Sequence, residues 1–469
     1  MVFSSLIFLF WFLPMVLLFY FMVEAKYRNW ILLFFSLFFY GWGEGEMLII
    51  MLFSACINFI FGMLIEQKES EGSRKWVLFL GIILNLSLLL FYKYGNFFTD
   101  NYNLLAHYFK IDPIIGDKII LPLGISFYTF HGMSYMIDVY RKHTPAQRNP
   151  LKLALYISFF PQLIAGPIVR YKDIESQMNE RSIDLELFAS GIKRFIIGLA
   201  KKVLLANIIG RIPAMVFKLP ESELNAYWSW LSIIAATLQV YLDFSGYSDM
   251  AIGLARMFGF KFKENFIYPF FSQSMKEFWT RWHISLSTWF KDYVYIPLGG
   301  SKNGKIRMYL NLWIVFLLTG FWHGASWSFI LFGAFHGLLI VLERLGLSKV
   351  LEFLPRMFRS VYVFMITAFS IIFFSIDDLT HIKHFYLSLF KFVSPDSFSR
   401  LNLYLTTEYY ITLIVALFVS FPFVEYLFGK IKKEKIRNRI ELAGIVLIFL
   451  LSIGELMNST FNPFIYFRF

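Results

Sequence analysis

The sequence is poor in charged residues. Only 16% of its 469 residues are Asp, Glu, Lys or Arg, whereas 58% are hydrophobic and 20% are aromatic. Soluble domains contain about 25% charged residues, and a water-soluble fold could not bury this much apolar surface. The composition therefore excludes an ordinary soluble protein.

Cysteine is almost absent. The single cysteine, Cys56, lies within an apolar run of the chain. It cannot form an intrachain disulfide, and a metal site made of several cysteines is excluded.

Long hydrophobic runs are abundant, and many approach or reach the roughly 20 residues that cross about 30 Å of hydrocarbon. The runs are 4–23, 31–42, 47–65, 77–92, 119–140, 151–169, 188–209, 228–242, 308–322, 326–342, 361–375, 409–428 and 440–453. The first run lacks a basic start and a clear cleavage site, so we expect a retained helix. The sequence predicts an all-α polytopic membrane protein with roughly 11–13 membrane helices. With no repeat or linker visible, we expect one domain over residues 1–469.

The net charge of +12 is concentrated in short loops. Basic residues cluster at 26–28, 68–75, 141–152 and 430–439, whereas the turn GWGEGE at 41–46 has two glutamates and no basic residue. Because basic loops next to membrane spans usually face the cytoplasm, we expect both termini on the outer side. The charge therefore predicts contact with membrane lipids and no nucleic-acid partner.

Polar residues interrupt the apolar stretch TLQVYLDFSGYSDMAIG at 237–253. Gln239 and Asp243 are one helical turn apart on the same face, and Asp249 follows six residues later. An ionisable side chain at membrane depth is costly and often functional. The alternative is a structural ion pair between an aspartate and Arg281 or another buried base.

A second polar cluster lies in MKEFWTRWHISLSTWFKDYVYIPLGG, within residues 250–305, which are too polar for clean spans and are expected to form re-entrant or interfacial helices. In a helix, His283 and Ser287 would be neighbours, and the hydroxyl would select the imidazole tautomer. The alternative is an amphipathic helix whose basic residues contact lipid headgroups. The charged residues of this cluster are Arg281, Lys291 and Asp292.

A third cluster, LLTGFWHGASWSFILFGAFHGLLI, contains His323 and His336. Gly320 and Gly324 flank the Trp322–His323 pair and would allow a ligand or another helix to approach closely. Thirteen residues of helix rotate a side chain by roughly 220°, so the two histidines would not ligate one metal ion, and no metal site is predicted. A lone histidine on an apolar helix usually serves packing, and we assign that role to His336, His107, His131, His143, His381 and His384.

Five ordered motifs together resemble the membrane-bound O-acyltransferase family, in its bacterial branch that acetylates alginate or peptidoglycan or transfers D-alanine to teichoic acid. They are PLGISFYTF at 122–130, FFPQLIAGPI at 159–168, DFSGYSDMAIG at 243–253, RWHISLSTWFKDYVYIPLGG at 281–300 and GFWHGASW at 320–327. The chain departs from the pattern at Thr280, where relatives often have a second arginine.

The resemblance implies that His323 is the catalytic histidine and that His283 is the second site residue. It also implies a ring of helices around a central tunnel in the bacterial cytoplasmic membrane. There a cytoplasmic donor such as acetyl-CoA would meet an outward-facing acceptor, without a permanently bound cofactor and with an extracytoplasmic polysaccharide acetyltransferase as partner. Supporting or substrate-binding roles are expected for Gln239, Asp243, Asp249, Arg281, Ser287, Lys291, Asp292 and Trp322.

The C-terminal aromatic motif at 461–469 ends in PFIYFRF and is expected on the outer side. In the D-alanyl branch a separate small partner ends in a similar motif, so its presence here favours acetyl transfer. Tyr466 is a candidate acyl relay, and the alternative is an aromatic anchor at the interface. Two other functions stay open: D-alanyl transfer, and a transporter or flippase, although no second copy of the Asp243 or His323 motif is visible.

Overall fold

The computed structural model describes residues 1–392 and 405–458, and these residues form helices and no β-strand. The all-α prediction is confirmed. The chain divides into two compact units, of which the first is Met1–Gly191 with Leu254–Lys263 and the second is the remainder. The single-domain organisation stays a prediction. The C-terminal aromatic motif and Tyr466 lie outside the described residues.

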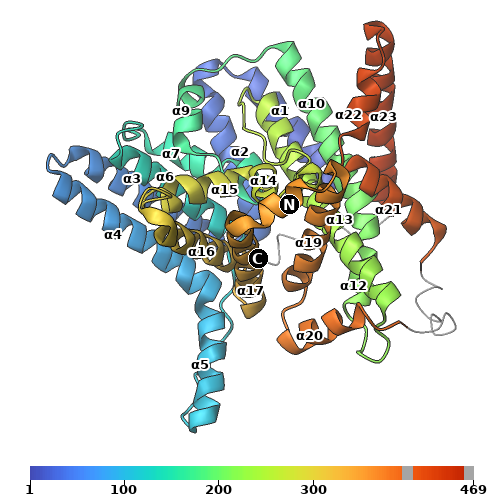
Figure 1. Ribbon diagram of the computed structural model, residues 1–469. Helices are drawn as coiled ribbons and strands as arrows, with labels where there is room; N and C mark the ends of the chain where they lie inside the picture. The colour runs from blue at the N-terminus through green and yellow to red at the C-terminus, as the bar shows by residue number, and fades with distance from the viewer. Residues whose placement is uncertain (393–404, 459–469) are drawn as a thin grey trace. The chain divides into compact units, whose positions relative to one another are not determined.

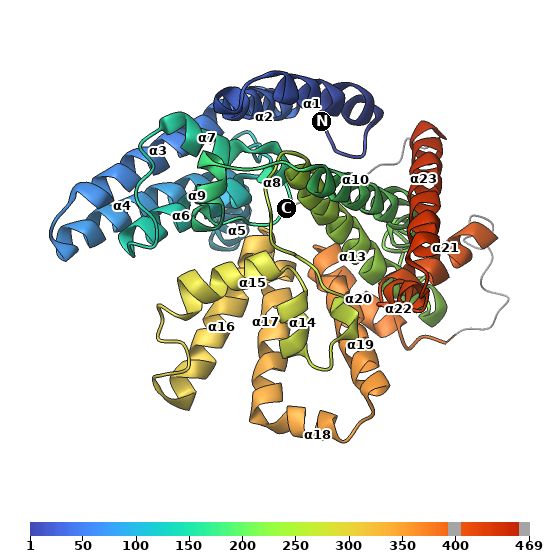
Figure 2. The same cartoon turned by 90° about the horizontal axis from the view of Figure 1, so that it is seen from above.

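The first unit begins with long helices and continues with shorter ones. Its helices are α1 (Leu13–Met22), α2 (Arg28–Glu44), α3 (Met47–Gln67), α4 (Glu71–Leu89), α5 (Gly95–Phe109), α6 (Ile125–Tyr140), α7 (Pro150–Ser158), α8 (Phe160–Leu163) and α9 (Tyr171–Asn179). Helices α3, α4 and α6 lie side by side (Figures 1 and 2). Between α3 and α4, the buried amides of Asn58 and Asn85 bond to each other at 3.1 Å, so neither is left unsatisfied in the apolar interface.

The second unit holds the histidine clusters. Its helices are α10 (Leu185–Ala200, which begins in the first unit), α11 (Asn207–Ile209), α12 (Arg211–Val216), α13 (Ala226–Met257), α14 (Met275–Arg281), α15 (Ile284–Phe290), α16 (Gly304–His323), α17 (Trp327–Leu342), α18 (Ser348–Glu352), α19 (Arg356–Ser375), α20 (Leu379–Ser388), α21 (Thr407–Val419), α22 (Phe423–Gly429) and α23 (Glu434–Asn458). The π-helical turns η4 (Lys201–Ala206) and η6 (Lys291–Tyr295) continue α10 and α15.

Five helical stretches among the described residues are long and apolar enough to cross a membrane. They are Met47–Gln67, Glu71–Phe109, Trp327–Glu352, Arg356–Ser375 and Glu434–Asn458. A sixth arises if α21 and α22, which meet at a 66° bend, form one broken span. The hydrophobic run 151–169 is divided in the structure, because the non-helical residue Phe159 separates α7 from α8. The run 188–209 is helical throughout, as α10, η4 and α11, but it is not among these stretches. The prediction of a polytopic membrane protein is confirmed.

Helices α16 and α17 form a closely packed hairpin, visible in both views (Figures 1 and 2). Gly320 of α16 faces Gly333 of α17, and a Cβ atom at Gly333 would overlap the carbonyl oxygen of Phe316. The backbones therefore touch, as small residues permit in membrane helix pairs. This contact fixes α17 against the C-terminal end of α16, where His323 lies.

A second close contact joins α10 to α13. Gly198 and Gly246 face each other so closely that a Cβ atom on either would overlap the other's carbonyl oxygen. Gly246 belongs to the DFSGYSDMAIG motif. The approach brings Lys201 and Lys202 of η4 alongside the aspartates of that motif.

Candidate active site

His323 is the last residue of α16 and is only 3% exposed. The chain becomes extended at Gly324, and α17 begins at Trp327. The imidazole lies against the rings of Phe332 and Phe374, at centroid distances of 5.8 and 5.6 Å. The space beside Gly324 is filled by the ring of Phe329, so a protein side chain occupies that approach.

His283 lies next to His323 although 40 residues separate them in the sequence. It is fully buried immediately before α15, and its backbone is left-handed, with φ 44° and ψ 53°. A non-glycine residue in this region is strained, which is frequent at functional sites. The ring centroids of His283 and His323 are 6.5 Å apart, and Trp322 packs against both. The two histidines named from the sequence are therefore brought together.

Asn265 orients the His283 ring. Its amide oxygen lies 3.3 Å from Nδ1 of His283 and accepts hydrogen bonds from the N–H and hydroxyl of Ser285, while its amide nitrogen donates to Ser248. Since an amide oxygen only accepts, this arrangement puts the proton on Nδ1 and leaves the lone pair on Nε2. Nε2 has no hydrogen-bond partner among the described residues.

His283 lies outside the candidate membrane spans. Burial of its ring and the nearby His323 both lower its pKa. The ring is therefore neutral at neutral pH. The sequence suggested Ser287 as the residue that selects the tautomer, but in the structure this contact is made by Asn265. Ser287 instead donates its backbone N–H to the carbonyl oxygen of His283.

Replacing Asn265 is expected to shift the pH dependence of catalysis. In Asn265→Asp a carboxylate would face Nδ1–H, which favours the imidazolium and raises the pKa of His283. Because the neutral form predominates only above the pKa, the acidic limb of the pH–rate profile should move to higher pH. Asn265→Ala should lower the rate at every pH, since the ring loses its orienting partner.

The measurement is the initial acyl-transfer rate of membranes between pH 5 and 9, with exposed Asn438→Ala on α23 as the matched control. An Asn265→Asp profile that superimposes on that of the wild type would contradict the assigned role.

The aspartates of DFSGYSDMAIG form ion pairs with the two lysines of η4. Asp243 and Lys202 are both buried, with an Nζ–Oδ1 distance of 2.7 Å. Asp249 is held by Lys201 at 2.7 Å and by Arg194 at 2.6 Å. Burial alone would raise the pKa of Asp249, but these two cations lower it below its ordinary value, so the carboxylate is ionised.

This ion-pair network extends toward the histidines. Arg194 binds Glu264 as well as Asp249, and the next residue, Asn265, is the one that orients His283. The ion pair of Arg194 with Glu264 therefore helps to hold Asn265 next to the His283 ring. No ion pair joins Asp243 to Arg281, which pairs instead with Glu277 at 2.8 Å.

Two cavities lie next to this region. A small one, lined by His323, His336, Trp279 and Phe332 among others, has about 20 Å³ of free volume. A larger groove of about 240 Å³ has an apolar floor, and its basic lining residues are Lys276, Lys291 and Arg344. Trp279 lines both. No carboxylate among the described residues forms an ion pair with these three cations within 4 Å.

The other residues named from the sequence are dispersed. Lys291 and Ser287 line the groove. Gln239 packs on Gly210, and Asp292 is half-buried on η6; neither lines a cavity described above. Trp322 packs against both histidines. The sequence analysis missed Asn265, Lys202 and Trp279; the only signal for Lys202 was a Lys-Lys pair inside an apolar run.

Comparison with known proteins gives a consistent result. A family model described as membrane-bound O-acyltransferase matches residues 119–382. A probable alginate O-acetylase of Azotobacter vinelandii is 37% identical over the full length of both chains. A peptidoglycan O-acetyltransferase of Helicobacter pylori is 36% identical over 73% of this chain and 70% of its own. A teichoic acid D-alanyltransferase of Bacillus subtilis is 32% identical over 48% and 59%.

Proposed function

Because the chain belongs to the membrane-bound O-acyltransferase family and is an O-acyltransferase, we propose that it transfers acetyl groups to hydroxyls of an extracytoplasmic polysaccharide or peptidoglycan. The observation that carries this proposal is the buried pair of His283 and His323, which gives the second unit a place for acid–base chemistry. Full-length similarity to a probable alginate O-acetylase supports acetyl as the acyl group.

In the proposed reaction neutral His323 acts as general base. It takes the proton of an acceptor hydroxyl while the oxygen attacks the carbonyl carbon of an acetyl thioester. The new C–O bond forms, the C–S bond breaks, and the departing thiolate takes the proton from the imidazolium. His283, with its lone pair on Nε2 and its ring fixed by Asn265, serves as the second histidine of the site.

The donor is proposed to be acetyl-CoA, delivered from the cytoplasmic side. The lining of the groove supports a phosphate-bearing donor. Lys276, Lys291 and Arg344 would contact the phosphates, and the apolar lining would contact the less polar part of the donor. Trp279 lines both the groove and the His323 cavity, so a donor in the groove would approach the base past this residue. Arg281, paired with Glu277, is less suited to this role.

The setting of the reaction is also a proposal. We place the protein in the bacterial cytoplasmic membrane, with a ring of helices around a tunnel to the outer side and a separate extracytoplasmic polysaccharide acetyltransferase that completes the transfer. A relay through Tyr466, outside the described residues, is the alternative to direct attack by the final acceptor.

The test is mass spectrometry of surface glycans from a strain that lacks this protein. Loss of acetyl esters, restored by the wild-type gene, is expected. Loss of D-alanyl esters with acetyl esters unchanged would favour the D-alanyl alternative. Accumulation of unexported glycan without any loss of ester per sugar would favour a transporter or flippase.

A further inference from the structure

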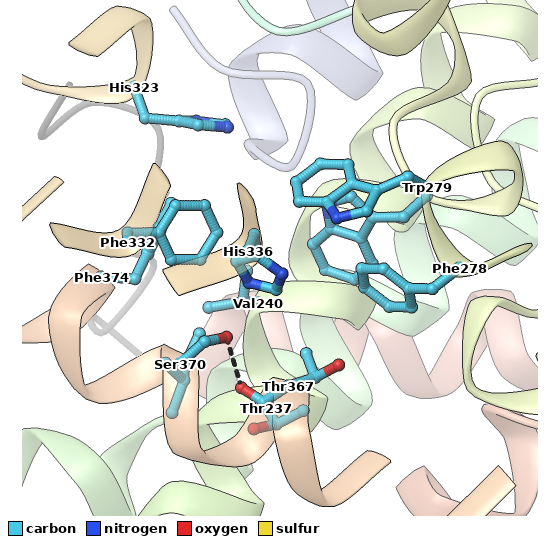
Figure 3. Close-up of a pocket in the computed structure, with 12 residues that line it drawn as sticks. Thr237, Val240, Phe278, Trp279, His323, Phe332, His336, Thr367, Ser370 and Phe374 are labelled. Atoms are coloured by element: carbon cyan, nitrogen blue, oxygen red, sulfur yellow. Dashed lines mark hydrogen bonds between the residues drawn. The ribbon is translucent and has the colours of Figure 1, made fainter. Parts of the chain in front are cut away.

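The small cavity beside His323 contains a second histidine that the reaction described above does not use. His336 of α17 is 1% exposed, and its ring contacts Phe332 and Trp279 at centroid distances of 4.6 and 5.1 Å. Figure 3 shows Phe332 between the two imidazoles and Trp279 beside His336. All four side chains line the same cavity.

Two N–H groups of this cavity have no acceptor within the part of the chain that the structure describes. Nε1 of Trp279 and both ring nitrogens of His336 are buried without a hydrogen-bond partner among the described residues. A buried polar group without a partner is costly, and a neutral imidazole always has one N–H donor. Both side chains therefore have donors that a bound molecule can satisfy.

The hydroxyls of the cavity cannot replace these donors. Thr237, Thr367 and Ser370 already donate to the backbone carbonyl oxygens of residues 233, 363 and 367. The rest of the wall is largely apolar and is formed by Val240, Phe278, Trp282, Ile371 and Phe374. Two N–H donors thus face a largely apolar, enclosed space.

The size of the cavity restricts what it can hold. Its free volume of about 20 Å³ is room for one or two groups the size of a water molecule. The walls cannot easily retreat, because His336 and Phe332 are carried by α17, which is locked to α16 through Gly320 and Gly333. Phe332 also packs on Phe374 at 5.7 Å.

We propose that this cavity is the acyl subsite of the transfer reaction and that the N–H groups of Trp279 and His336 bind the acyl carbonyl oxygen. This rests on the proposed function. When the acceptor oxygen adds to the carbonyl carbon, the C=O electron pair moves to the carbonyl oxygen, and the two N–H groups stabilise the resulting oxyanion. The electron pair returns as the C–S bond breaks. The methyl group lies against Phe332 and Phe374.

The first test removes the donors one at a time and retains the rings. Trp279→Phe and His336→Phe should each lower kcat by about 10² to 10³-fold, as the loss of one oxyanion donor does, with little change in the KM for acetyl-CoA. The better of His336→Asn and His336→Gln should retain much more activity than His336→Phe, because an amide N–H replaces that of the imidazole. A purely packing role for His336 predicts the opposite order.

The assay is release of the CoA thiol from acetyl-CoA by membranes of cells that carry each variant in place of the chromosomal gene. Phe335→Leu, which alters the other side of His336 without lining the cavity, is the matched control and should behave like the wild type. Near-wild-type kcat in Trp279→Phe and His336→Phe would overturn the subsite. No thiol release by the wild type would instead overturn acetyl-CoA as donor, and this inference with it.

The second test is acyl-chain length. Each extra methylene in a filled apolar pocket discriminates by about 10- to 200-fold, so butyryl-CoA should react at least 10-fold more slowly than acetyl-CoA with the wild type. Phe332→Leu, which enlarges the cavity, should narrow that ratio. Equal rates for the two donors in the wild type would overturn the size restriction.

Discussion

His323→Ala is expected to abolish acetylation of the surface glycan while the protein still inserts into the membrane. Removing a positioned general base lowers a rate by about 10² to 10⁴-fold, and no other base among the described residues occupies the end of α16. The alanine leaves a small void beside Phe332 and Phe374. We expect normal protein levels, and the measurement is ester-linked acetate per sugar by mass spectrometry.

A matched histidine far from the site in the sequence serves as control. His107 on α5 is exposed, and His107→Ala should acetylate normally. His283→Ala should also impair acetylation, although by a smaller factor than His323→Ala if its ring assists and is not the base. Near-normal acetylation in His323→Ala would disprove the catalytic assignment.

Asp243→Ala should be strongly destabilising. The substitution leaves the ammonium of Lys202, which is itself buried, without the carboxylate that lies 2.7 Å away. Removing one partner of a buried pair costs about 3–5 kcal/mol, a large part of the stability of a typical domain. The measurement is the thermal unfolding midpoint of the detergent-purified protein, together with its yield from membranes.

A double variant distinguishes this explanation from a direct role in chemistry. Lys202→Met combined with Asp243→Leu replaces both charges by apolar groups, so it should recover most of the stability lost in Asp243→Ala. Exposed Asp112→Asn is the control and should change the free energy of unfolding by no more than about 0.5 kcal/mol. A double variant as unstable as Asp243→Ala would argue against the ion pair as the cause.

These two predictions show why polar residues assigned to one candidate site from the sequence have different roles. The sequence placed Asp243, Asp249, His283 and His323 in one candidate site, because each is unusual in an apolar chain. Lys201 and Lys202 form ion pairs with the aspartates, whereas the two imidazoles lie against each other and against Trp322. Pairing partners lie far along the chain, so no local pattern could separate the two groups.

His336 illustrates the same limit. It is predicted to serve packing, as a lone histidine on an apolar helix usually does. The prediction that it points away from His323, thirteen residues earlier, assumes a continuous helix. The structure breaks the helix at Gly324 and reverses the chain, so α16 and α17 lie side by side and both histidines line one cavity. A three-residue break in the helix, at residues 324–326, decides which side chains meet.

The sequence alone determined the class of this protein, since apolar runs of bilayer length and a low charged fraction leave an all-α membrane protein as the physical solution. Its ordered motifs also identified the family, which the comparisons confirm. Only the tertiary structure decided which polar residues are neighbours: His283 with His323 and Trp322, Asn265 with His283, and Lys202 with Asp243. Those contacts depend on close helix approaches at glycines and on a strained residue at His283, and both are properties of the packed chain that residue spacing does not contain.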